Sequence, residues 1–244
     1  MTERFAHADQ RIGRNLTYGM LDDLGREIVT GGYKGRSFPT EAELAKSHGV
    51  SRSVTREAMK MLAAKGLVSA RPRQGTAVRP SVHWNLFDPD VLRWLLEREF
   101  SIDLLRHFTQ LRIAIEPEAA ALAARYGEVA DHAAIAAGLA RMADADGGAG
   151  DALEADLAFH VAVLRAAKNP FYGQFKDVVA TALSTSIRFT NTITGHSASM
   201  TEHGAVADAI LARDADAARV AMRALIGNVL TLIEGAEPDG VGQL

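Results

Sequence analysis

The chain has 244 residues, of which 48% are hydrophobic, so it is long enough for two domains that each bury a core. It contains no cysteine, which excludes disulfides, thiolate metal sites and thiol nucleophiles, and which suits a reducing cytoplasm. We expect no signal peptide, because charged residues interrupt the N-terminal segment, and no membrane span, because no run of about 18 uncharged apolar residues occurs.

The net charge of −3 conceals two parts of opposite sign. Residues 1–80 hold fourteen Lys and Arg against eight Asp and Glu, a net charge of +6, whereas residues 81–244 hold thirteen against twenty-two, a net charge of −9. Surface charge can vary along a chain without a functional reason. The asymmetry nevertheless favours a polyanionic partner for the first part alone.

Three helices are predicted before residue 67. The first, over residues 15–30, carries a stripe of apolar residues at helical spacing: Leu16, Met20, Leu21, Leu24 and Ile28. Thr40 and Glu43 have the spacing of a capping box, which predicts a second helix that runs to about His48. After Gly49, Ser51 can cap a third helix. We expect that helix to bury Val54, Ala58, Met61 and Leu62.

The remaining pattern predicts a mainly α fold, in which a winged helix-turn-helix precedes an all-α bundle of six to seven helices. Residues 67–71 and 76–79 read as two short strands around Pro-Arg-Gln-Gly, which makes a basic hairpin. The later helices are expected at 89–99, 102–126, 128–144, 150–167, 170–190, 198–213 and 215–234. We therefore expect a DNA-binding domain over 1–80, a linker over 81–87, a helical domain over 88–235 and a disordered tail over 236–244.

The third helix carries the residue types that read DNA. In a helix-turn-helix, the N-terminal turns of the second helix of the pair enter the major groove. Those turns hold Ser51, Arg52, Ser53, Thr55 and Arg56. The two arginines stand four residues apart on one face, and a guanidinium suits bidentate contact with guanine or phosphate. A solvated helix face would also carry two arginines, but the basic hairpin that follows favours DNA binding.

These residues resemble the N-terminal domain of the GntR family of transcription regulators. The matching positions are Pro39, Glu41, Leu44, Gly49-Val50-Ser51-Arg52, Arg56-Glu57-Ala58, Gly66-Leu67-Val68 and Gly75-Thr76. The resemblance implies that Ser51, Arg52 and Arg56 contact DNA and that Gln74 and Gly75, at the tip of the wing, approach the minor groove. Ala42 departs from the pattern, because some members carry a DNA-contacting arginine there.

A carboxylate and an imidazole stand four residues apart in the second part of the chain. Asp156 and His160 therefore project from one helical face, where they could bind a metal or form an ordinary hydrogen-bonded pair. The apolar residues around them indicate a largely buried helix. A carboxylate without a partner would be costly at that depth.

Residues 88–235 resemble the ligand-binding domain of the FadR branch of the GntR family, called the FCD domain. The resemblance implies a small-carboxylate effector and a divalent metal, Zn²⁺ or Ni²⁺, on Asp156, His160 and His203. The family's fourth ligand would fall at Leu225, which cannot bind metal, so a metal-free pocket competes with a three-ligand site.

Arg112 corresponds to an arginine that in FCD domains points toward the effector carboxylate, and its planar fork suits that contact. Its alternative role is a salt bridge with Glu116 on the same helix. Arg188 and Asn191, near a helix end, are further candidates for the effector pocket. The segments around Trp84 and Trp94 resemble sugar-acid-responsive regulators of galactonate catabolism, which makes a sugar acid the favoured effector.

We therefore expect an effector-responsive repressor, not an enzyme, that binds a palindromic operator in double-stranded DNA as a homodimer in the cytoplasm. One alternative is a metal-dependent hydrolase fused to a DNA-binding module, although no dedicated base is evident. Glu202 adjoins His203 but would point about 100° away from it on a helix. A second alternative is a helical scaffold that binds only protein.

Overall fold

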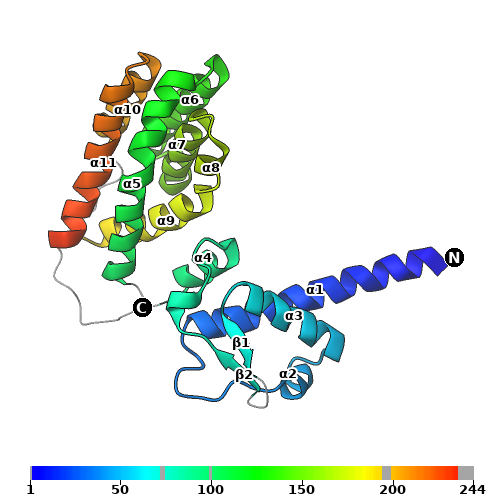
Figure 1. The fold of residues 1–244 in the computed structure, drawn as a ribbon. Helices are drawn as coiled ribbons and strands as arrows, with labels where there is room; N and C mark the ends of the chain where they lie inside the picture. The colour runs from blue at the N-terminus through cyan, green and yellow to red at the C-terminus, as the bar shows by residue number, and fades with distance from the viewer. Residues whose placement is uncertain (1, 72–74, 99–100, 194–198, 236–244) are drawn as a thin grey trace. The chain divides into compact units, whose positions relative to one another are not determined.

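The structure is a computed structural model that describes residues 2–71, 75–98, 101–193 and 199–235, with residues 2–14, 71 and 186–193 given by their backbone alone. The chain divides into two compact units, Met1–Glu99 and Phe100–Leu244 (Figure 1). Helices dominate both units, and a two-stranded antiparallel sheet lies in the first. The predicted fold class is confirmed. The predicted tail over 236–244 lies outside the described residues.

The first unit is a helix-turn-helix with a hairpin wing and one additional helix. Its elements are α1 (Thr2–Val29), α2 (Glu41–Ser47), α3 (Arg52–Ala64), β1 (Val68–Arg71), β2 (Gly75–Val78), the 3-10 turn η1 (Ser81–His83) and α4 (Pro89–Leu96). Thr40 Oγ1 accepts a hydrogen bond from the amide of Glu43 at 3.3 Å, and the Glu43 carboxylate accepts one from the amide of Thr40 at 2.8 Å. The predicted capping box at the start of α2 is therefore present.

Two details of the predicted helices differ from the structure. Helix α1 begins at Thr2 rather than near residue 15, and Leu16 is 47% exposed although the other members of the predicted stripe are buried. On α3, the buried residues are Thr55, Ala58, Met59 and Leu62. Val54 and Met61, which were expected in the core, are only half-buried. The face of α3 that packs on α1 is rotated by about one residue from the purely apolar stripe.

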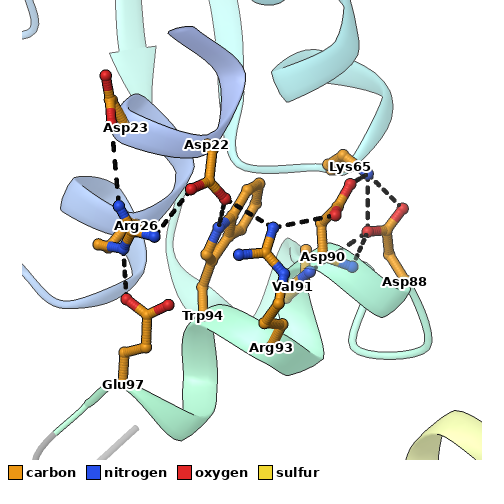
Figure 2. Close-up of polar contacts among 10 residues, drawn as sticks. All are labelled: Asp22, Asp23, Arg26, Lys65, Asp88, Asp90, Val91, Arg93, Trp94 and Glu97. Carbon is orange, nitrogen blue, oxygen red and sulfur yellow. Dashed lines mark hydrogen bonds and ion pairs between the residues drawn. The ribbon is translucent and has the colours of Figure 1, made fainter. Parts of the chain in front are cut away.

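Helix α4 packs on α1 in the first unit, and a tryptophan anchors it there. The Trp94 side chain is fully buried, and its indole Nε1–H donates to Asp22 Oδ1 at 2.8 Å (Figure 2). The ring lies so close to Gly25 of α1 that a Cβ atom on residue 25 would come within 2.2 Å of it. Arg93 donates to the same Asp22 oxygen at 2.6 Å, and Arg26 pairs with Glu97.

The observed division of the chain therefore falls after α4. The sequence placed residues from 88 onward in the helical domain, whereas the structure divides the chain between Glu99 and Phe100. The segment over 81–87, expected as a linker, joins the wing to α4 within the first unit and contains η1. The amphipathic pattern of residues 89–96 predicts a helix but does not indicate which core receives it.

The second unit is an all-helical bundle. Its described part contains α5 (Ile102–Tyr126), α6 (Val129–Asp146), α7 (Ala152–Ala166), α8 (Pro170–Gly173), α9 (Lys176–Ile193), α10 (Met200–Leu211) and α11 (Ala215–Gly235). Helix α11 lies along α5, α6 packs on α7, and α10 contacts α5, α6 and α11 (Figure 1). The single helix predicted over 170–190 is two helices, α8 and α9. None of the helices in the described ranges is long and apolar enough to span a membrane.

Small side chains allow these helices to approach one another closely. Four alanines of α5 are fully buried in the core: Ala119, Ala120, Ala123 and Ala124. Gly138 of α6 faces Phe159 of α7 so closely that a Cβ on residue 138 would come within 2.9 Å of the Phe159 Cα atom. The close contact brings α7, with its polar residues Asp156 and His160, into the centre of the bundle.

The contact between Gly25 and Trp94 predicts a strong dependence of the first unit on residue 25. We expect Gly25→Ala to lower the free energy of unfolding of this unit by about 1–3 kcal/mol, because the added methyl group overlaps the indole ring. Both tryptophans of the chain, Trp84 and Trp94, lie in the first unit, so their fluorescence during urea titration reports on that unit.

Gly19→Ala is the matched control, because a Cβ at this exposed position of α1 has no neighbour within 4 Å. We expect this substitution to be neutral or to stabilise the unit by up to about 1 kcal/mol, since alanine favours the helix. Equal midpoints for the two variants would contradict the close packing of α4 on α1.

Candidate functional site

The first candidate site is the exposed N-terminal part of α3. Ser51 caps the helix, because its side chain accepts a hydrogen bond from the amide of Val54 at 3.3 Å. Arg52, Ser53 and Arg56 are exposed on the turns that follow. Arg56 Nε lies 3.8 Å from a carboxylate oxygen of Glu41 on α2, a long ion pair at the surface. The two arginines are therefore presented to solvent and available for an anionic partner.

Thr55 does not belong to this exposed face. Its side chain is fully buried, and its hydroxyl donates to the carbonyl of Ser51 at 3.2 Å. The hydroxyl is thereby satisfied within the helix, which allows a polar residue to lie in the core beside Ala58. A buried threonine cannot reach a base edge, so the prediction that Thr55 contacts DNA is wrong.

The wing is an antiparallel hairpin whose register pairs Val68 with Val78 and Arg71 with Gly75. Gly75 is exposed and has a φ of +83°, a conformation that favours glycine where the hairpin turns. Gln74 lies outside the described residues. The structure therefore describes one of the two predicted wing-tip residues, Gly75, and places it at the end of the hairpin.

The second candidate site is a buried cluster of Asp156 and His160 on α7 with His203 on α10. One ligand atom from each of the three residues can be chosen so that all lie within 4.8 Å of one another. Asp156 Oδ1 is 3.1 Å from His203 Nε2 and 3.3 Å from His160 Nε2. The ring of Phe159, which is fully buried, lies roughly perpendicular to both imidazoles. The spacing within α7 and the position of α10 thus bring together the three predicted ligands.

The hydrogen bonds of the two histidines fit a metal site. His203 Nδ1 lies 2.9 Å from the carbonyl oxygen of Ser199, which can only accept, and His160 Nδ1 contacts the carboxylate of Glu116. In each ring, Nδ1–H is therefore the donor, and Nε2 is directed toward Asp156. Such a second hydrogen bond fixes the orientation of many metal-ligating histidines. The donor set of one carboxylate and two imidazoles suits Zn²⁺ or Ni²⁺.

Glu116 and Arg112, both on α5, complete the buried cluster. Arg112 Nε donates to Glu116 at 2.5 Å, and its Nη2 lies 3.2 Å from His160 Nε2. Arg112 therefore has the salt bridge that was the alternative to effector binding, and it also adjoins the candidate metal ligands. Sequence analysis treated Glu116 only as a partner of Arg112. Its contact with His160 depends on the packing of α5 against α7, which no local pattern reveals.

The charges in the cluster shift the pKa values of its members. Burial alone would raise the pKa of Glu116, but the positive charges of Arg112 and His160 outweigh burial and lower the pKa to about 2. Burial likewise raises the pKa of Asp156, but the neighbouring imidazoles of His160 and His203 hold it well below its usual range. Burial lowers the pKa of His160, whereas the Glu116 carboxylate raises it to about 9. Without another cation, Arg112 and a proton on His160 together balance the two carboxylates.

The other predicted site residues have different surroundings. Arg188 and Asn191 lie on α9, but their side chains are outside the described part of the structure. Leu225 of α11 is 5% exposed and belongs to the apolar core of the second unit. The position expected for a fourth ligand thus contributes packing.

Comparison with known proteins finds one family model in each of the two units. The model for the FCD domain matches residues 107–228, and the model for bacterial regulatory proteins of the gntR family matches residues 20–78. The uncharacterized HTH-type transcriptional regulator YieP of Escherichia coli is 35% identical over 216 residues, which cover 87% of this chain and 93% of that protein. The galactonate operon transcriptional repressor of Escherichia coli is 34% identical over 219 residues, which cover 88% and 95%.

A solved structure of McbR/YncC from Escherichia coli shares the fold, with a TM-score of 0.50 and 17% identity over 90% of this chain and 97% of that one. A helix-turn-helix with a hairpin wing, followed by a helical unit, defines a two-domain transcription regulator. The chain belongs to the GntR family of bacterial regulatory proteins, with an FCD domain as its second part. Its relatives are regulators and not enzymes, so the hydrolase alternative gains no support.

The buried Arg112–Glu116 pair leads to a prediction about stability. We expect Glu116→Gln to lower the free energy of unfolding of the second unit by about 3–5 kcal/mol, because Arg112 is left without a counter-charge in the core. The double variant Arg112→Met/Glu116→Gln should lose less free energy of unfolding than the two single variants lose in total. Thermal unfolding followed by circular dichroism measures the effect, while tryptophan fluorescence follows the first unit separately.

The partly exposed ion pair between Glu118 of α5 and Arg219 of α11 provides the control, since it lies in the same unit but near the surface. Glu118→Gln should change the unfolding transition little. If Glu116→Gln and Glu118→Gln behave alike, the cluster around His160 is not a buried charge network.

Proposed function

We propose that this GntR-family chain is a cytoplasmic repressor that binds a palindromic operator as a homodimer and senses a small carboxylate in its FCD domain. The observation that carries the DNA-binding part is the exposure of Arg52 and Arg56 at the capped start of α3. A positively charged first part and a hairpin wing next to this helix support the same role. Two copies would present two α3 helices to the two halves of a palindrome.

The effector-sensing part rests on the buried cluster of the second unit. Asp156, His160 and His203 would hold a divalent cation, which would supply a positive charge and open coordination positions for oxygen atoms of an effector. Arg112 lies beside His160 and would contact the effector carboxylate if its fork exchanged Glu116 for the incoming group. One relative is named as the galactonate operon transcriptional repressor. On the basis of that name, we propose a sugar acid as the effector class of this chain.

A ligand at this cluster would act by shifting a population of conformations. Because the cluster joins α5, α7 and α10, a change in its hydrogen bonds changes the packing of three helices of the FCD domain. The effector must bind one arrangement of the domain more tightly than another, since equal affinity would shift nothing. The arrangement it favours decides whether the dimer holds or releases the operator.

The DNA-binding part is tested by Arg52→Ala and Arg56→Ala. Each substitution should weaken operator binding by about 1–3 kcal/mol, because it removes an exposed guanidinium from the helix that enters the groove. Fluorescence anisotropy measures the affinity for a duplex that the wild-type protein enriches from a random library. The tryptophan unfolding transition should be unchanged, since neither side chain packs in the core.

Arg36→Ala is the matched control, because it removes the same charge from the exposed loop that precedes α2. We expect it to leave the enriched sequence and the affinity nearly unchanged. If Arg52→Ala and Arg56→Ala bind this duplex as tightly as the wild type does, α3 is not the helix that reads the operator.

The metal part is tested by titrating chelator-treated protein with Zn²⁺ or Ni²⁺ in a calorimeter. We expect one ion per chain. Asp156→Asn and His203→Ala should each reduce the affinity by more than the roughly 10- to 100-fold expected for loss of a ligand's hydrogen-bond partner. Leu225→His should increase the affinity if position 225 faces the ion as a fourth ligand would.

His83→Ala provides the control for adventitious binding, because this histidine is exposed in the first unit. Its affinity should match that of the wild type. Binding that survives Asp156→Asn and His203→Ala but falls in His83→Ala would place the ion elsewhere and favour a metal-free effector pocket.

A further inference from the structure

Lys65, which directly follows α3, has its side chain bound by three carboxylate oxygens. The side chain is 11% exposed, and Nζ lies 2.8 Å from both carboxylate oxygens of Asp88 and 2.8 Å from Oδ2 of Asp90 (Figure 2). An ammonium group has three N–H donors and no acceptor, so these three contacts use its full hydrogen-bonding capacity. Lys65 is thus committed to the protein, in contrast to the exposed arginines at the start of α3.

The carboxylate that binds Lys65 also begins α4. Asp88 is the N-cap of this helix, and its Oδ1 accepts hydrogen bonds from the amides of Asp90 at 3.0 Å and Val91 at 3.3 Å. The main chain of Lys65 is held by the same segment, since the amide of Asn85 donates to its carbonyl oxygen at 2.9 Å. The C-terminal end of α3 is therefore fastened to the start of α4 by both side chain and backbone.

The opposite side of this connection is fixed on α1. Trp94 packs against Gly25 and donates to Asp22, and Arg93 binds the same carboxylate (Figure 2). Helix α4 thus links α1 to the end of α3, in addition to the direct packing of α3 on α1. A side-chain substitution at Lys65 removes only the side-chain part of this attachment of α3, and it leaves the backbone hydrogen bond from Asn85 and the core contacts of Ala58 and Leu62 in place.

We propose that Lys65 is a positioning residue for operator binding, which orients α3 through Asp88 and Asp90 without touching DNA itself. The inference rests on the proposed entry of α3 into the major groove. Helix α3 has 13 residues and is about 20 Å long, so a tilt of about 5° at its C-terminal end moves its first turn by roughly 1.7 Å. Such a displacement is enough to break hydrogen bonds from Arg52 and Arg56 to base edges.

The competing role for a lysine in this position is direct contact with a phosphate, and the two roles make opposite predictions for one variant. Asp88→Asn/Asp90→Asn removes two negative charges and frees the Lys65 ammonium group. If Lys65 contacts a phosphate, this variant should therefore bind DNA more tightly than the wild type does. A positioning lysine would lose its charged partners and the strength of those hydrogen bonds, and DNA binding would weaken although the unit becomes more positive. Asparagine is a good N-cap, so α4 retains its start.

The experiment measures the affinity of the full-length protein for the duplex enriched by the wild type, over a range of salt concentrations. We expect Lys65→Met and Asp88→Asn/Asp90→Asn each to weaken binding by about tenfold, similar to the loss of one base contact. For Lys65→Met the slope of log affinity against log salt should stay at the wild-type value, because no phosphate contact is lost.

Glu97→Gln is the matched control, since it breaks the ion pair with Arg26 on α1 at the end of α4 opposite to Asp88 and Asp90. It should leave the affinity unchanged. The tryptophan unfolding transition gives the folded fraction of each variant. If Lys65→Met fails to fold, the Asp88→Asn/Asp90→Asn variant decides the question by the direction of its change.

Three results would overturn the inference: tighter binding by Asp88→Asn/Asp90→Asn, a fall of about 0.9 in the salt slope of Lys65→Met, or losses that only follow the unfolded fraction. Two other results would instead contradict the proposed function: the wild type enriches no sequence from the library, or the Arg52→Ala variant binds the enriched duplex as tightly as the wild type does.

Discussion

The second unit depends on the mutual compensation of buried charges. Among the described residues of this unit, five ionisable side chains are buried: Arg112, Glu116, Asp156, His160 and His203. Any one of them alone would cost several kcal/mol, because the interior solvates charge poorly. Since they come from α5, α7 and α10, these three helices can pack only in an arrangement that brings the partners together. The groups that hold the core are therefore also the groups of the candidate site.

This double role gives a small ligand a direct route to the packing of the domain. Arg112 and Glu116 satisfy each other in the structure, and a proton on His160 balances the remaining carboxylate charge. An incoming carboxylate would compete with Glu116 for the fork of Arg112, and a divalent cation would compete with the proton on His160. The carboxylate adds one negative charge, and the divalent cation adds a net positive charge when it replaces the proton. The two exchanges together therefore preserve charge balance while they change which helices are connected. An apolar core would offer no comparable exchange.

Sequence alone predicts the features whose contacts are local. The caps at Thr40 and Ser51 depend on residues within three positions, and both are present in the structure. Asp156 and His160 share a face through simple helical spacing, and the family resemblance added His203. These predictions needed no knowledge of how helices pack.

The features that sequence failed to predict depend on contacts between distant segments. Thr55 counts as polar in any hydrophobicity pattern, but a bond to the Ser51 carbonyl lets it enter the core. The role of Glu116 requires α5 to lie against α7. Helix α4 belongs to the first unit because Trp94 meets Gly25, a contact across more than sixty residues that periodicity cannot indicate.

The position of α4 in the chain restricts how the second unit can influence DNA binding. Helix α4 ends at Leu96 and the second unit begins at Phe100, so a change transmitted along the chain acts on α4 before it reaches α3. A shift from 1:99 to 99:1 between two states requires about 5.5 kcal/mol of differential binding. The Lys65 contacts are partly exposed, 11% at the lysine and 36% at Asp90, so breaking them costs less than the roughly 3–5 kcal/mol of a fully buried pair. An effector that loosened them in one state would have to supply their cost in addition to that difference in affinity, so the Lys65 contacts oppose a reorientation of α3.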